Sequence, residues 1–240
     1  VGTVLRGLGE LLYPPTCWTC GVLTQPEPAP LCAHCMHRIT HDPFPTCPRC
    51  SSTVGPHTAL ENGCPECSAH SFAFDGVFRM GPYEGLLRET ILRMKSWTGE
   101  ELTEAIAPLW ARAIAPKLRS RQLDLVVPVP LHWQRRWQRG FNVNDLLAAS
   151  LAQELHVPCL PQVLKRIRAT PQQSAQPSAA ARKDNVKDAF SPRHFTAMEG
   201  KRVVLVDDVL TTGATAHEAA RALGTLRPAA TFVAVMAHGR

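Results

Sequence analysis

The chain has 240 residues, of which 45% are hydrophobic, and a formal net charge of +6 at pH 7. This length and composition suit a globular α/β domain accompanied by a small second unit. No apolar run approaches the length that spans a bilayer, and the N-terminal stretch lacks the pattern of a signal peptide. These patterns argue against membrane insertion and predict a soluble, cytoplasmic protein.

The positive charge is concentrated in one stretch of the chain. Residues 1–75 sum to −3, residues 76–131 to +2 and residues 132–202 to +7, whereas the remaining residues are neutral. A basic segment of this kind favours a polyanionic ligand, although a solvated basic face would have the same composition.

Eight of the nine cysteines form four Cys-x-x-Cys pairs in the N-terminal third. Each pair offers two thiolates to a tetrahedral ion, so two pairs complete one structural zinc site. A disulfide framework is disfavoured because the cysteine count is odd and no secretory signal is visible. Pairing in chain order is expected, and pairing of the first with the third knuckle is the alternative. The expected ligands are Cys17, Cys20, Cys32 and Cys35 for one ion, and Cys47, Cys50, Cys64 and Cys67 for the other.

The middle of the chain predicts the start of an α/β unit. Phe72 and Phe74 alternate with polar or small residues before Val77, which predicts an edge strand, and an amphipathic helix follows. A second helix is expected over residues 98–118, interrupted by Pro108. The apolar stretch 123–127 predicts the first core strand.

Next comes an arginine-rich stretch that we expect to form a loop. Arg135, Arg136 and Arg139 precede Gly140, and a helix follows whose N-cap is Asn142 or Asn144. Because a loop at the carboxyl end of a strand opens into the ligand crevice of an α/β sheet, these guanidinium groups could hold a pyrophosphate there.

A polar segment over residues 164–190 is rich in Gln, Ser, Ala and Pro. This composition predicts a mobile lid, and a disordered linker is the alternative. The ligand-facing side chains expected in it are Arg166, Arg168, Thr170, Gln173, Arg182 and Asn185.

The stretch VVLVDDVLTTGAT, residues 203–215, predicts a buried parallel strand, a loop and the start of a helix. Ligands of open α/β sheets bind at this end of the strands, and a helix N-terminus favours an anion such as phosphate. Asp207 and Asp208 would repel a phosphate, so they are expected to hold ribose hydroxyls or Mg²⁺. A helix-capping or solvated acidic pair is the alternative.

This stretch is similar to the phosphoribosyl pyrophosphate (PRPP) binding motif of type I phosphoribosyltransferases. Together with the four cysteine pairs and the stretches LRMKSWTG, RRWQRGFN, RIRATPQQ and ARKDNVKDAF, it resembles the ComF family of phosphoribosyltransferase-like proteins. The resemblance implies an α/β fold with a parallel sheet flanked by helices, a double zinc ribbon over residues 1–70 and a phosphoribosyltransferase-like domain over residues 71–240.

The resemblance also implies ligands and site residues. It implies two structural Zn²⁺ ions, Mg²⁺ bound with PRPP or another phosphoribosyl compound and, in competence members, a role in handling single-stranded DNA. The implied catalytic residues are Asp207, Asp208, Arg135 and Arg139. The implied substrate-binding residues are Thr211, Thr212, Gly213, Ala214, Thr215, Arg136, Lys95, Arg168 and Arg182.

Several functions are compatible with these patterns. The first is a phosphoribosyltransferase, for which no base-recognition element identifies the acceptor. The second is a non-catalytic protein that keeps the phosphoribosyl pocket and binds single-stranded nucleic acid, with Trp133, Trp137 and Phe141 as stacking candidates. In a third, the zinc ribbons dock a partner protein of the competence machinery.

Overall fold

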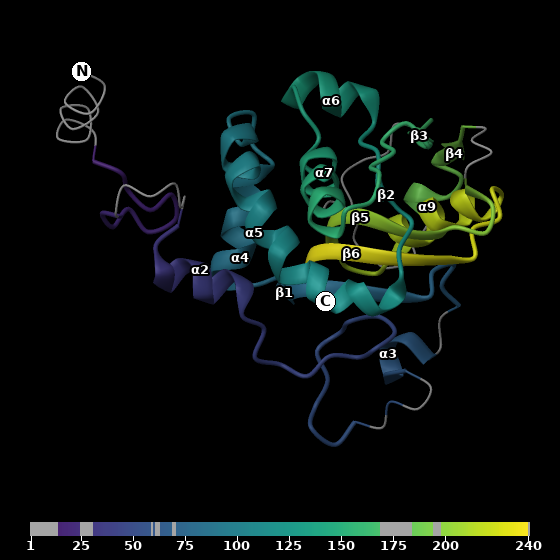
Figure 1. Ribbon diagram of the computed structural model, residues 1–240, viewed down its shortest axis with the longest axis horizontal. Helices are drawn as coiled ribbons and strands as arrows, with labels where there is room; N and C mark the ends of the chain where they lie inside the picture. The colour runs from purple at the N-terminus through teal and green to yellow at the C-terminus, as the bar shows by residue number, and fades with distance from the viewer. Residues whose placement is uncertain are drawn as a thin grey trace.

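A computed structural model describes residues 14–24, 31–58, 60, 63–68, 71–168, 184–193 and 198–239. Figure 1 shows a central sheet with helices packed around it and the cysteine-rich segment along one side. The elements in chain order are α2 (Ala33–Thr40), α3 (Pro65–Ser68), β1 (Gly76–Pro82), α4 (Gly85–Met94), α5 (Glu100–Leu118), a short 3₁₀ helix (Arg119–Arg121), β2 (Leu125–Pro128), α6 (Trp133–Arg139), α7 (Val143–Leu155), β3 (Leu164–Arg166), β4 (Phe190–Pro192), β5 (Arg202–Leu210), α9 (Ala214–Gly224) and β6 (Ala230–His238).

The main sheet has the strand order β1-β6-β5-β2, and all its neighbours are parallel. β3 and β4 form a separate antiparallel pair. The α/β fold with a parallel sheet is therefore confirmed, and β1 is the predicted edge strand. It begins later than expected, because Phe72 and Phe74 precede it and pack against the core outside the ladder.

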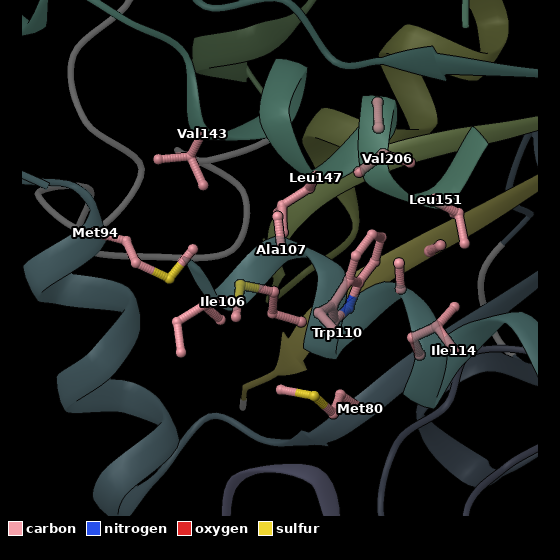
Figure 2. Close-up of a cluster of buried hydrophobic side chains, with 14 of the residues drawn as sticks. Met80, Met94, Ile106, Ala107, Trp110, Ile114, Val143, Leu147, Leu151 and Val206 are labelled. Carbon is pink, nitrogen blue, oxygen red and sulfur yellow. The ribbon is translucent and has the colours of Figure 1, made fainter. Parts of the chain in front are cut away.

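Both faces of the sheet are buried, so each core strand alternates between two hydrophobic clusters. In β5, Val204 and Val206 face one cluster, and Val203 and Leu205 face the other. Helices α4, α5 and α7 cover the first face, whose side chains are drawn in Figure 2. Helix α9 and the β3–β4 pair cover the second. Burial on both faces explains the continuous apolar sequence of β5.

Helix α5 differs from the prediction because it runs without a break through Pro108. Its buried face explains why the helix tolerates the proline. Trp110, two residues further along the helix, is fully buried and donates its indole N–H to the Val235 carbonyl at 3.1 Å. This packing, visible in Figure 2, outweighs the loss of one backbone hydrogen bond.

The cysteine-rich segment packs against the β1 edge of the sheet (Figure 1). The Val77 N–H donates to the Arg49 carbonyl at 3.1 Å. Arg79 on β1 is buried and forms an ion pair of 2.9 Å with Asp42, while its other nitrogen donates to Thr53 at 2.7 Å. These contacts tie the two parts of the chain together. None of the helices in the described ranges is both long and apolar enough to cross a membrane.

Candidate functional site

The acidic pair lies near the end of β5, beside the loop that leads into α9. Both carboxylates are half-buried, and the strand continues two residues past them to Leu210. Residues 211–213 form a bend, and Gly213 is the N-cap of α9 with φ of 74°. Gly213 is favoured by its left-handed φ, and a Cβ there would also crowd the Phe72 ring at 3.1 Å. Residues 203–215 therefore have the expected strand–loop–helix geometry.

Each carboxylate has a specific partner. The Asn144 side-chain amide donates to Asp207 Oδ1 at 2.9 Å and to the Val129 carbonyl at 3.0 Å. The Asp208 backbone N–H also donates to Asp207 Oδ1, at 3.0 Å. Asp208 forms an ion pair of 2.9 Å with Lys95, at the end of α4. The site thus draws on β5, α7 and α4.

Burial and neighbouring charges shift the pKa values of Asp207 and Lys95. Burial and the neighbouring Asp208 charge raise the pKa of Asp207 to about 7, although the Asn144 hydrogen bond and Lys95 oppose the rise. Burial lowers the pKa of Lys95, but the carboxylate of Asp208 outweighs it and the net change is upward. Lys95 therefore stays charged, while Asp207 binds and releases a proton near neutral pH.

The arginine stretch is a helix, α6, and not the loop that we predicted. The His132 side chain accepts a hydrogen bond from the Gln134 N–H at its start, and Gly140, with φ of 87°, ends it. These caps stabilise one short helix between the strand and α7. Asn142 is the N-cap of α7, as one of the two expected alternatives.

The three arginines of α6 have different surroundings. Burial lowers the pKa of Arg139, while Asp208 raises it, so this guanidinium lies in the field of the acidic pair. Arg135 is partly buried, and its charge lowers the pKa of Arg139. Arg136 is exposed and forms an ion pair of 3.1 Å with Asp145. The structure thus places Arg139 in the field of Asp208 and Arg135 in the field of Arg139, while Arg136 is engaged by Asp145.

The lid residues fall into two groups. Arg166 is not in a mobile lid, because it lies in β3, is 8% exposed and stacks over the Phe190 ring at 5.3 Å. Its pKa is lowered by burial and Arg135 and raised by Asp207, so its charge also reaches the site. Arg168 donates to the Lys187 carbonyl, and Asn185 lies half-buried before β4. Three predicted residues lie outside the described part of the chain: Thr170, Gln173 and Arg182.

The cysteine sulfurs form two compact clusters in chain order. One contains Cys17, Cys20, Cys32 and Cys35 and the other Cys47, Cys50, Cys64 and Cys67, and within each cluster all sulfurs lie within 4.8 Å of one another. The cross-braced pairing is therefore not the arrangement adopted. Sulfur–sulfur distances of 3.5–3.8 Å match the edge of about 3.8 Å expected for a tetrahedron with Zn–S bonds of about 2.3 Å. Both clusters fit a zinc ion.

The first and third of the four Cys-x-x-Cys knuckles are built alike. Thr16 pairs with Leu23 across the first and Thr46 with Thr53 across the third. The left-handed position after the second cysteine is Gly21 in the first knuckle, with φ of 71°. In the third knuckle it is a serine, Ser51, with φ of 61°.

The surroundings of Cys47 favour its thiolate form, which is the form that binds zinc. Burial raises its pKa, but hydrogen bonds from the backbone N–H groups of Cys50, Arg49 and Cys64 lower it to about 7. These donors aid metal binding because zinc requires the deprotonated sulfur.

The aromatic residues considered for base stacking differ in their solvent exposure. Trp133 is 65% exposed and Trp137 is 84% exposed, both on α6. Trp97, near Lys95, is 81% exposed. Phe141 is 5% exposed and belongs to the core, so its proposed stacking role is wrong.

The comparisons with known proteins agree with this architecture. A family model described as "Double zinc ribbon domain" matches residues 8–70, and one described as "Phosphoribosyl transferase domain" matches residues 146–240. Competence protein F of Haemophilus influenzae is 34% identical over 200 residues, covering 82% of this chain and 85% of the relative. The chain belongs to the ComF family. Another relative, DNA utilization protein YhgH of Escherichia coli K12, is 34% identical over 217 residues, covering 89% of this chain and 92% of its own.

More distant relatives extend the family. Competence protein ComFC of Bacillus subtilis is 25% identical over 212 residues, covering 86% of this chain and 82% of its own. Among solved structures, glutamine PRPP amidotransferase from B. subtilis aligns with a TM-score of 0.40 and 21% identity, covering 60% of this chain and 30% of its own. This chain joins a double zinc ribbon to a phosphoribosyltransferase-type domain, and its relatives are named for competence and DNA utilisation.

Proposed function

We propose that the site on β5 binds a phosphoribosyl compound, with PRPP as the simplest candidate. The observation that carries this proposal is the Asp207–Asp208 pair, held by Asn144 and Lys95 just before the Gly213 helix start. Carboxylates suit ribose hydroxyls, and the loop and first turn of α9 offer N–H groups and threonine hydroxyls to a 5′-phosphate.

The carboxylates also fit a Mg²⁺ ion that enters with the diphosphate. Two half-buried acidic residues are consecutive in β5, and the pKa of Asp207 is raised by burial and by its neighbour's charge. A divalent cation held by Asp207 and Asp208 would relieve that repulsion and neutralise charge on the diphosphate.

Arg135 and Arg139 are the proposed diphosphate-binding groups. They lie four residues apart on α6, and the charges of Arg139 and Asp208 attract each other. Arg166, which is buried, adds a third positive charge nearby. In a transfer reaction, the bond between the ribose C1 and the diphosphate oxygen breaks with its electron pair on oxygen, and a nucleophile's lone pair forms the new bond to C1. Positive charge at the leaving group stabilises this transition state.

Two zinc ions are the proposed structural cofactors of the ribbons. Sulfur-only, four-coordinate sites leave no position open for catalysis. The tetrahedral sulfur spacing supports this assignment.

A single-stranded nucleic acid is the second candidate ligand, favoured by the exposed tryptophans of α6. Trp133 and Trp137 share a seven-residue helix with three arginines. Aromatic faces beside cations bind unpaired bases and their phosphates. The names of the relatives in competence and DNA utilisation are compatible with such a partner.

Calorimetric titration with PRPP and Mg²⁺ tests the primary proposal, followed by measurement of pyrophosphate release in an acceptor screen. Asp207→Asn and Asp208→Asn are expected to weaken PRPP binding by about tenfold or more. Unchanged binding in both variants would refute the site. Strand binding with a steep salt dependence, lost in Trp137→Ala and kept in Asp208→Asn, would instead support the second candidate.

A further inference from the structure

Phe72 lies between the second cysteine cluster and the loop before α9. Its side chain packs against the cluster of Cys47, Cys50, Cys64 and Cys67, and also against the hydrophobic core on the α9 side of the sheet. The position of a Cβ on Gly213 would be 3.1 Å from its ring carbon Cε1. The ring therefore lies directly on the backbone of the loop.

Arg49 holds this ring from the cysteine side. It stands between Cys47 and Cys50, and its guanidinium carbon lies 6.0 Å from the Phe72 ring centroid. The same guanidinium donates to the Cys67 carbonyl at 3.3 Å. One side chain thus joins both halves of the sulfur cluster to Phe72.

The next residue forms a hydrogen bond with α9 itself. The Ala73 N–H donates to His217 Nδ1 at 3.1 Å, and the His217 backbone N–H donates to the Gly213 carbonyl at 2.8 Å. His217 lies in the first turn of α9, and its side chain is 25% exposed. The segment after the second ribbon therefore contacts the loop at Gly213 and the helix one turn later.

We propose that Phe72 and His217 are positioning residues, through which the second cysteine cluster fixes the conformation of residues 211–215 and so their affinity for a sugar 5′-phosphate. This inference rests on the proposed function of that loop. A bend with a left-handed glycine has little regular hydrogen bonding of its own, so outside contacts must select one conformation. A loop fixed before binding loses less entropy when the phosphate binds.

Hydrogen exchange of the zinc-loaded full chain tests the positioning directly, without a ligand. Phe72→Ala and His217→Ala are expected to raise the exchange rate in the peptide covering residues 211–217 by about fivefold. His217→Asn should restore the wild-type rate, because its Oδ1 can accept the Ala73 hydrogen bond. Val54→Ala is the matched control, since Val54 packs on the same cysteine cluster without a described contact to the loop. Equal exchange in wild type, Phe72→Ala and His217→Ala would overturn the inference.

Binding measurements then separate this inference from the proposed function. Ribose 5-phosphate affinity is expected to fall about fivefold in His217→Ala and about tenfold in Phe72→Ala, with inorganic pyrophosphate affinity unchanged. Equal losses for both ligands would indicate general damage and would also overturn the positioning role. If wild type binds no ribose 5-phosphate while the exchange pattern holds, the proposed function fails and the control of the loop by Phe72 and His217 stands.

Discussion

Asp207 is held in an environment that opposes its charge. Burial and the charge of Asp208 raise the pKa of its carboxyl group to about 7, compared with the ordinary value of 3.8. A native pKa above the unfolded one means that the folded state binds the proton more tightly. Stability is therefore lost as the pH rises from about 4 to about 7, and the loss persists above that range.

Asp207→Asn should consequently stabilise the protein while it weakens PRPP binding. We expect a gain in the free energy of unfolding of about 3 kcal/mol at pH 8, and about half of it at pH 5.5. Urea denaturation of the zinc-loaded protein at both pH values measures this. Asp124→Asn is a control without a gain, because a hydrogen bond from the Arg202 backbone N–H lowers the pKa of Asp124. A loss of stability in Asp207→Asn at pH 8 would contradict this account.

Ser51 offers a second test at the residue scale. Its φ of 61° is a conformation that favours glycine, and Gly21 takes the corresponding position in the first knuckle. Ser51→Gly should stabilise the zinc-loaded protein by about 1 kcal/mol, and Gly21→Ser should destabilise it by a similar amount. Denaturant midpoints give both values. A lower midpoint for Ser51→Gly would show that the serine side chain matters more than the backbone.

The sequence identifies the residues of the site better than it identifies the side chains that contact them. Asp207, Asp208 and the eight cysteines stand out because their types and spacing carry the chemistry. The sequence indicates Asn144 only as a helix cap, since nothing near it in sequence shows that its amide reaches Asp207 on β5. Phe72 and His217 were missed as a pair for the same reason.

At the scale of elements, strand–loop–helix units were predictable and the arginine helix was not. The β5–α9 unit follows from an apolar run, a glycine and helical spacing. Helix α6 has no buried residue to give it a hydrophobic period, so its sequence resembles a charged loop. The capping residues His132 and Gly140 stabilise this helix instead.

The helical arrangement of α6 predicts unequal roles for its arginines. Arg139→Ala should weaken pyrophosphate binding about tenfold or more, because a charged hydrogen-bond donor near Asp208 is lost. Arg136→Ala should change it by less than about twofold, because Arg136 is exposed and paired with Asp145. Titration calorimetry compares the two. Equal effects would mean that α6 presents a different face to the ligand.

At the scale of the molecule, the ribbons and the sheet form one packed structure. The Arg79–Asp42 ion pair has side chains that are 1% and 7% exposed, and it joins the segment between the two ribbons to β1. The sequence did not predict this pair, because its members are 37 residues apart and neither belongs to a recognisable motif. The boundary at residue 70 stays a prediction.

Breaking this pair should destabilise the whole protein. Asp42→Asn leaves a buried guanidinium without its counter-charge, so we expect a loss of about 3 kcal/mol in the free energy of unfolding. The double variant Asp42→Leu/Arg79→Met should recover most of that loss, because no buried charge remains. Denaturation curves of the wild type and of both variants measure the two changes. A loss below about 1 kcal/mol for Asp42→Asn would show that the ribbons contribute little to the sheet's stability.

The central claim is that the end of β5 and the start of α9 hold a sugar phosphate. A crystal structure of the zinc-loaded chain with PRPP and Mg²⁺ tests it most directly. We predict the ribose hydroxyls at Asp207 and Asp208, the 5′-phosphate on residues 211–215 and the diphosphate facing Arg135 and Arg139. A complex in which PRPP binds elsewhere, with this loop and both carboxylates free of ligand, would contradict the account.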